Sequence, residues 1–202
     1  MPRLARQPDG AVLAAAYEAW GPGLSARTIG EYAYVVFDRK TRQLVAGQDS
    51  LGVRRIFHAA SRGKVLITSN LRLLFQLFPE ARPSYDREVL REYFAGTMRP
   101  WSGRTIWNGV SELGRGKALT QKADQLTPTT VWEPPLEVGD RFKSAKEVDE
   151  AFRKHLFDAV RAALRSSGPV LCDLSGGYDS STVYSVAGHL IEAGESSAAL
   201  IG

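Results

Sequence analysis

The feature that most constrains the fold is a short string near the C-terminus, Ser175-Gly176-Gly177-Tyr178-Asp179-Ser180-Ser181. An apolar run at 169–174 precedes it and predicts a buried strand, and the pattern at 179–193 predicts a helix. A long amphipathic helix opens upstream at Ser144, and a further apolar run at 198–201 predicts another strand. The order helix, strand, loop, helix, strand predicts the start of an α/β doubly wound parallel sheet.

The loop has the chemistry of an anion site. Ligands of open parallel sheets bind at the carboxyl ends of the strands. Adjacent glycines let backbone N–H groups approach an anion, and the following helix directs its positive dipole end to the same place. A carboxylate beside phosphates suits a bridging divalent cation, so Asp179 predicts Mg²⁺. The predicted ATP and pyrophosphate site comprises Leu174, Ser175, Gly176, Gly177, Asp179, Ser180 and Ser181.

A structural interpretation of the same string is a plain strand-to-helix turn with Asp179 or Ser180 as the N-cap. The length and context of the string favour the phosphate site over that turn. The string lacks the Gly-Lys-Ser/Thr ending of a Walker A loop and the Gly-x-Gly-x-x-Gly spacing of a dinucleotide fold.

The N-terminal part predicts an α+β domain with an antiparallel sheet. Helical spacing covers residues 9–20, with Asp9 as a candidate cap and Gly21-Pro22-Gly23 as the stop. Short strand-like runs separated by turn residues predict neighbouring antiparallel strands. These runs lie at 31–37, 43–46, 55–59 and 64–68. Short helices are expected at 71–78 and, capped by Asp86, through Phe94; an ordered loop at 100–116 and a closing hairpin at 117–121 and 125–132 follow.

The run Glu133-Pro134-Pro135 is the best candidate for a linker, since prolines there cannot continue a ladder. We therefore expect one domain at 1–135 and the start of a second at 136–202. The second opens with Ser144, and Glu147 three residues later predicts a capping box.

Composition and charge favour a soluble, cytoplasmic protein. The net charge of +4 comes from scattered Lys and Arg residues; it is compatible with an anionic small ligand, and we expect no nucleic-acid partner. Apolar runs are too short for a membrane span, and residues 1–10 lack an apolar signal core. The single cysteine, Cys172, cannot form an internal disulfide, which suits the reducing cytoplasm.

The histidines, the single cysteine and several aromatic residues are candidates for a functional site, but we interpret them as structural residues. The histidines lack metal-ligand spacing, the cysteine lies inside an apolar strand, and aromatic residues are more often packing than a ligand wall. They are His58, His155, His189, Cys172, Tyr93, Phe94, Trp101 and Trp107.

The Ser-Gly-Gly-x-Asp-Ser string resembles the pyrophosphate loop of the ATP pyrophosphatase superfamily. The upstream residues resemble the asparagine synthetase family, whose relatives include β-lactam synthetases and lasso-peptide cyclases. The matching segments are the helix at 9–20, Gly30 to Asp38, Gln48-Asp49-Ser50-Leu51-Gly52, Thr105-Ile106-Trp107, Gly109-Val110 and Trp132. The resemblance implies an Ntn-hydrolase-like glutaminase domain followed by an ATP-binding synthetase domain.

Several positions depart from the family pattern. The family's glutaminase uses an N-terminal cysteine, whereas Pro2 follows Met1 here, so we expect no catalytic nucleophile and a chain truncated at both ends. Asp9 falls where the family binds the glutamine amine, although a helix cap is the favoured interpretation. Gln48 replaces the family's arginine.

The resemblance implies an ATP-dependent amidoligase that activates a small-molecule or peptide carboxylate as an acyl-adenylate, with release of pyrophosphate. ATP and Mg²⁺ are the implied cofactors, and asparagine biosynthesis is the leading function. Whether the protein forms a homodimer is left open. The alternatives are a cysteine-less cyclase that forms a β-lactam or macrolactam, and a non-catalytic fragment.

Overall fold

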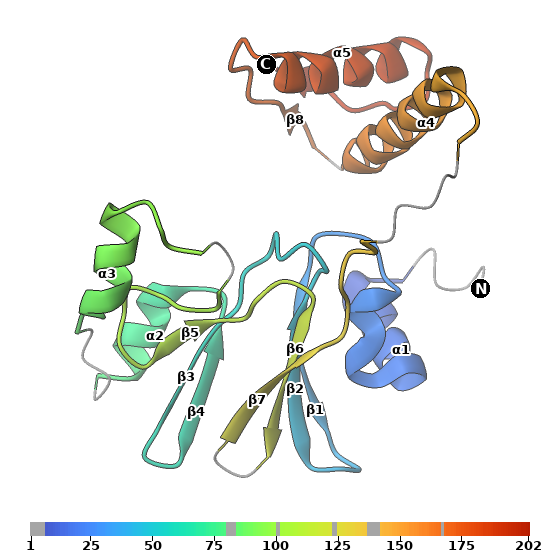
Figure 1. Cartoon of the computed structure of the whole chain (residues 1–202). Coiled ribbons are helices and arrows are strands. Elements are labelled where there is room, and N and C mark those ends of the chain that lie inside the picture. The colour runs from blue at the N-terminus through green and yellow to red at the C-terminus, as the bar shows by residue number, and fades with distance from the viewer. Residues whose placement is uncertain (1–6, 80–83, 100–101, 123–124, 137–141, 167) are drawn as a thin grey trace. The chain divides into compact units, whose positions relative to one another are not determined.

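The computed structural model describes residues 7–79, 84–99, 102–122, 125–136, 142–166 and 168–202. The chain divides into two compact units, Met1–Pro134 and Pro135–Gly202 (Figure 1). Each unit has apolar clusters of its own. None of the helices in these ranges is long and apolar enough to cross a membrane.

The described residues of the first unit form short helices and seven strands. Its helical elements are α1 (Asp9–Trp20), the 3₁₀ helix η2 (Gly21–Ala26), α2 (Leu71–Leu77) and α3 (Arg87–Phe94). Its strands are β1 (Ala33–Asp38), β2 (Gln43–Gln48), β3 (Phe57–Ser61), β4 (Lys64–Thr68), β5 (Val110–Glu112), β6 (Lys117–Lys122) and β7 (Gln125–Thr130).

The strands form two antiparallel sheets, in the orders β1-β2-β6-β7 and β4-β3-β5. The expectation of antiparallel strands is confirmed, but the expectation of one sheet is wrong. After β2 the turn around Asp49 redirects the chain, and β3 then pairs with β4 and β5 instead of with β2. The predicted loop at 100–116 likewise contains β5, whose three residues are too few to leave a sequence pattern.

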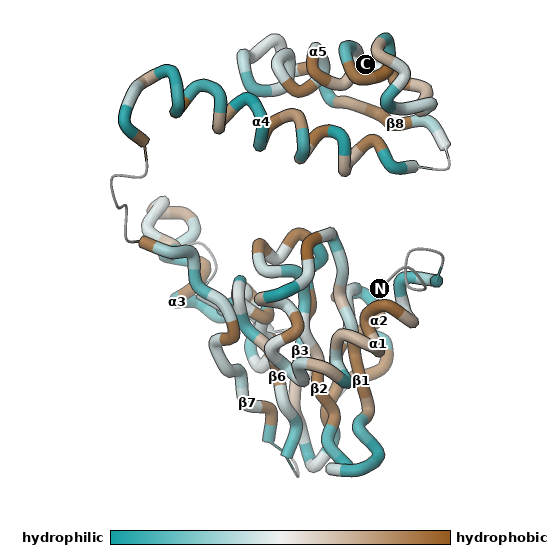
Figure 2. Tube along the Cα trace, turned by 90° about the vertical axis from the view of Figure 1, so that its right-hand side faces the viewer, coloured by the Kyte–Doolittle hydropathy of each residue, from teal (hydrophilic) through white to brown (hydrophobic). Residues whose placement is uncertain are grey.

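Apolar side chains order these elements into layers. Ala16 and Leu24 of α1 and η2 pack on Tyr34 and Val45 of the first sheet. The opposite face of that sheet contributes Ala46 and Leu119 to a cluster that includes Ile67 of the second sheet. On the far side of the second sheet, α2 packs through Leu74. Figure 2 shows hydrophobic colouring along β1 and β2 and hydrophilic colouring at the turn that joins them.

The second unit contains α4 (Ala145–Ala163), β8 (Val170–Leu171), α5 (Tyr178–Glu192) and β9 (Leu200–Ile201). The strands pair in parallel, with Val170 opposite Leu200. The helices pack through Val160, Leu164, Val186 and Leu190. Hydrophobic and hydrophilic segments alternate along α4 in Figure 2, as expected for an amphipathic helix.

Two capping predictions are confirmed, one at Asp86 in the first unit and one at Ser144 in the second. Asp86 accepts hydrogen bonds from the N–H groups of Glu88 and Val89 at the start of α3. The Ser144 hydroxyl accepts from the N–H of Glu147 at 3.2 Å, as a capping box requires. The Glu147 carboxylate accepts from the N–H of Lys143, one residue before the cap, and not from the N–H of Ser144, so the second half of the predicted box differs.

The predicted buried strand at 169–174 is wrong in length and in burial. Only Val170 and Leu171 form a strand, and Leu171 is 71% exposed. Val170 packs against the cluster formed by α4 and α5, whereas Leu171 points to the other face of the two-stranded sheet. Cys172 is half-buried rather than enclosed.

Candidate functional site

The loop between β8 and α5 has the backbone of an open strand-to-helix connection. Gly176 has a φ of +79°, a conformation that favours glycine. Gly177 is the N-cap of α5, and no side chain accepts a hydrogen bond from the first N–H groups of this helix. The interpretation of Asp179 or Ser180 as the N-cap is therefore wrong, because the helix begins earlier, at Tyr178.

Hydroxyl groups within the loop are not equivalent. The Ser175 and Ser180 hydroxyls lie 3.1 Å apart, and the Ser175 N–H donates to the Ser180 hydroxyl at 3.3 Å. The Gly177 N–H donates to the Ser175 hydroxyl at 3.3 Å. Ser181 stands apart from these contacts and uses its backbone N–H to reach the carbonyl of Gly177. Two of the three serine hydroxyls in the predicted site therefore bond to each other.

Asp179 lies in the first turn of α5, and both it and Leu174 are exposed. Across the described ranges there is no group of three or more His, Cys, Asp or Glu side chains arranged to hold a metal ion. Mg²⁺ is commonly bound by one or two carboxylates together with the phosphates of a substrate. A single carboxylate beside N–H groups that no side chain caps therefore fits Mg²⁺ that arrives with a polyphosphate, and it does not fit a metal held by protein side chains alone.

Asp9 does not cap α1; its place is the first helical turn, and Pro8 is the N-cap. It lines a cavity of about 630 Å³ together with Glu31, Arg54 and Arg55. Glu31 and Arg54 form an ion pair at 3.4 Å, with both side chains more than half exposed. The cavity thus carries carboxylates and guanidinium groups side by side.

A buried polar hub holds the wall of this cavity and was missed by sequence reasoning. Gln48 is 2% exposed; its amide donates to the Leu113 carbonyl at 2.7 Å and accepts from the Ile56 N–H at 3.0 Å. The Asp49 carboxylate accepts from the N–H groups of Val53 and Arg54, each at 3.0 Å. Only the unusual pairing of two polar residues after an apolar strand could have signalled this hub.

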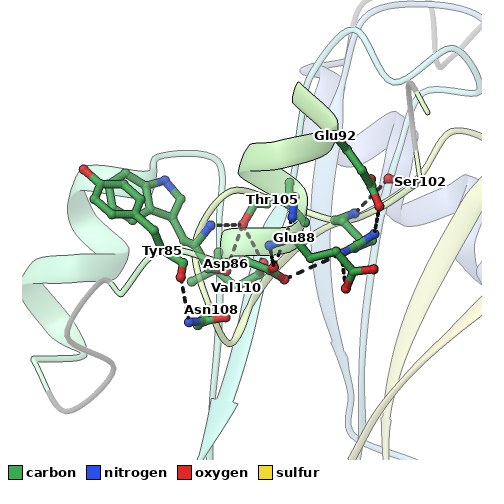
Figure 3. Close-up of polar contacts among 11 residues, drawn as sticks. Tyr85, Asp86, Glu88, Glu92, Ser102, Thr105, Asn108 and Val110 are labelled. Atoms are coloured by element: carbon green, nitrogen blue, oxygen red, sulfur yellow. Dashed lines mark hydrogen bonds and ion pairs between the residues drawn. The ribbon is translucent and has the colours of Figure 1, made fainter. Parts of the chain in front are cut away.

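A second polar cluster surrounds Arg104. Its guanidinium donates to Glu92 at 2.8 Å and lies within 3.4 Å of Glu88 and 3.7 Å of Asp86. These three carboxylates lie together at the side of α3 in Figure 3. The hydrogen bond to Glu92 raises the pKa of Arg104 above its ordinary value. The cluster ties the segment before β5 to α3 and has the character of a structural clamp.

The aromatic residues and histidines that we interpreted as structural lie in different environments. Trp107 stacks on Tyr85 and meets Phe75 edge-on, so its predicted packing role is confirmed. Tyr93 and Phe94 are exposed, which contradicts a core role for them, and Trp101 lies outside the described residues. Burial lowers the pKa of His58.

Comparisons with known proteins match two separate stretches of this chain, one in each unit. Residues 2–132 match the family of glutamine amidotransferase domains, and residues 151–196 match asparagine synthase. The class of protein is therefore one with a glutamine amidotransferase-type domain in a mixed α/β fold. The chain belongs to the asparagine synthetase-like family, which confirms the resemblance seen in the sequence.

Individual relatives are similar over most of this chain. Amidase chry2 of Gibberella zeae is 29% identical over 197 residues, which cover 92% of this chain and 27% of the relative. Asparagine synthetase [glutamine-hydrolyzing] 3 of Bacillus subtilis is 30% identical over 191 residues, which cover 94% of this chain and 31% of the relative. A putative asparagine synthetase [glutamine-hydrolyzing] of Mycobacterium tuberculosis is 28% identical over 190 residues, which cover 89% of this chain and 28% of the relative. The chain spans less than a third of the length of these relatives.

Proposed function

We propose that this protein is an ATP-dependent amidoligase of the asparagine synthase type. It activates a carboxylate as an acyl-adenylate, releases pyrophosphate, and forms an amide when an amine displaces AMP. The observation that carries the proposal is the loop from Ser175 to Ser181, with its uncapped helix start and its single carboxylate at Asp179. Similarity to asparagine synthetases over about nine tenths of the chain supports it.

In this proposal each part of the loop has a task in the first step. A carboxylate oxygen of the acyl substrate forms a bond to the α-phosphorus of ATP, and the bond from that phosphorus to the bridging oxygen breaks. Pyrophosphate leaves with the electron pair. Backbone N–H groups at the start of α5 would stabilise its negative charge. Asp179 is the residue that would hold Mg²⁺, and the cation would supply positive charge to the phosphate oxygens. In the second step the amine nitrogen bonds to the acyl carbon, AMP leaves, and the nitrogen loses a proton.

Glycine at positions 176 and 177 keeps the approach to the N–H groups free of side chains. A Cβ at Gly177 would lie 3.3 Å from the Ser175 hydroxyl, a close contact even before a phosphate is bound. A β-branched side chain there would extend further, toward the start of α5. We therefore expect Gly177→Val to impair ATP use by obstruction.

The test is ATP–pyrophosphate exchange with aspartate as the carboxylate, on Asp179→Ala and Gly177→Val. Each should lose two or more powers of ten in rate, roughly 3 kcal/mol of transition-state stabilisation. Melting temperatures should hold, because Asp179 caps nothing. The matched control is Glu192→Ala, which removes a carboxylate at the other end of α5. Normal exchange in Asp179→Ala would refute the assignment of the loop.

Two alternatives give different results in the same assay. A cyclase would exchange pyrophosphate with an amine-bearing carboxylate substrate and not with aspartate. A non-catalytic protein would show no exchange with any carboxylate. An amidase and an asparagine synthetase each match about nine tenths of this chain. This similarity does not decide whether the acyl substrate is aspartate or another carboxylate.

For the first unit we propose that Asp9 contributes to binding the amine of a glutamine-like zwitterion. The support is its place in a cavity that also carries Arg54 and Arg55, which suit a carboxylate. Calorimetric titration with glutamine should give weaker binding for Asp9→Asn than for the unsubstituted protein. Equal affinities would remove Asp9 from this role.

A further inference from the structure

Ser180 differs from the other loop residues in how its hydroxyl is used. It is half-buried, whereas Ser175 and Ser181 are exposed. Its oxygen accepts from the Ser175 N–H at 3.3 Å, lies 3.1 Å from the Ser175 hydroxyl, and lies 3.4 Å from the Gly177 carbonyl. Every one of these partners belongs to the loop itself.

The number of hydroxyl protons and acceptors in the loop determines which serine can donate a hydrogen bond to a ligand. A serine hydroxyl has one proton to donate and two lone pairs to accept with. The Ser180 proton has two acceptors within reach, the nearer Ser175 hydroxyl and the more distant Gly177 carbonyl. If Ser180 donates to the Gly177 carbonyl, it can accept the Ser175 proton at the same time. If Ser180 donates to Ser175 instead, the Ser175 oxygen also accepts from the Gly177 N–H, and the Ser175 proton is left for a ligand; the proposal takes this second arrangement.

We propose that Ser180 is a positioning residue that locks the loop and orients Ser175, and that Ser180 does not itself contact the phosphates. This rests on the proposed function, in which the loop binds the pyrophosphate part of ATP. Ser175 supplies a hydroxyl donor to the ligand, and Ser180 holds that donor in place.

The lock matters because the loop is otherwise free to move. Gly176 and Gly177 lack side chains, and nothing lies within 4 Å of a Cβ added at Gly176. Glycine carries more conformational freedom than any other residue, so an untethered loop loses more entropy when it binds an anion. The Ser180 contacts join the start of the loop to the first turn of α5 and reduce that loss.

The experiment compares Ser180→Ala, Ser180→Thr and the control Ser185→Ala in the 202-residue chain. Ser185 lies farther along α5, and its hydroxyl bonds to the Ser181 carbonyl at 2.8 Å without reaching the loop contacts. The first measurement is hydrogen exchange of the Ser175 amide without nucleotide. We expect roughly five- to tenfold faster exchange in Ser180→Ala, and wild-type rates in Ser180→Thr and Ser185→Ala.

The second measurement is the affinity for Mg·ATP by calorimetry. Ser180→Ala should bind roughly five- to tenfold more weakly, and Ser180→Thr should restore the affinity because it keeps the hydroxyl. Ser175→Ala should lose affinity while its amide at position 175 stays protected, since Ser180 still accepts from that N–H. The effects of Ser175→Ala and Ser180→Ala should be less than additive, because one residue acts partly through the other.

The outcomes separate the lock from the proposed function. Unchanged exchange of the Ser175 amide in Ser180→Ala would overturn the lock, whatever happens to affinity. Additive losses in the double variant would also overturn it, since they indicate an independent contact of Ser180 with the phosphates. If the unsubstituted chain binds no Mg·ATP, the proposed function fails, and exchange alone then decides whether Ser180 locks the loop.

Discussion

Gln48 offers the sharpest test of how the first unit is held together. Its amide satisfies the Ile56 N–H and the Leu113 carbonyl, and both of those residues are at most 2% exposed. Gln48→Leu keeps a similar volume and removes the polar group. It therefore leaves a buried donor and a buried acceptor without this partner.

Each orphaned group costs about 1–3 kcal/mol, and the more favourable burial of leucine offsets part of the sum. We expect a net loss of about 2–4 kcal/mol in the free energy of unfolding. For a unit of this size the melting temperature should fall by roughly 6–15 °C. The loss should appear as a lower urea midpoint with an unchanged slope, because the buried surface stays the same.

The matched control is Gln43→Leu, at the other end of β2, where the side chain is half-buried and remote from the hub. It should change the free energy of unfolding by less than about 0.5–1 kcal/mol, as surface substitutions usually do. Amide exchange at Ile56 should accelerate in Gln48→Leu alone. A Gln48→Leu melt within 2 °C of the unsubstituted protein would refute the reasoning, where about 2 °C corresponds to less than 1 kcal/mol.

Two further predictions concern single positions. Gly116→Ala should destabilise the first unit strongly, because φ is +62° and the added Cβ would overlap the Trp132 carbonyl oxygen; a thermal melt close to that of the unsubstituted protein would contradict this. Burial lowers the pKa of His58, so the unfolded chain binds a proton at higher pH than the folded one. Unfolding free energy should therefore fall as pH drops through the ordinary histidine range near 6.5 and level off below the folded pKa. Denaturant titrations across pH should show this loss shrinking in His58→Gln and persisting in His155→Gln.

Features set by neighbouring residues could be predicted from the sequence alone. The caps at Asp86 and Ser144 depend on hydrogen bonds across two or three residues, and both have the expected partners. The antiparallel pairing of β6 with β7 and the helix after the Gly-Gly pair follow from local sequence spacing in the same way. The family resemblance also rests on local signals, the string at 175–181 and the shorter segments that precede it in order.

The tertiary structure decided whatever depends on residues far apart in the chain. The partition into two sheets and the short β5 arise from pairings across about fifty residues, as between Phe57 and Glu112. Gln48 acquires its role from Leu113, 65 positions away. Asp9 lines a cavity with Arg54 because the fold places these distant residues near each other. Leu171 is exposed because the helices cover only the other face of its strand. Hydrogen bonds and burial are properties of neighbours in space, and a pattern along the chain records only neighbours in sequence.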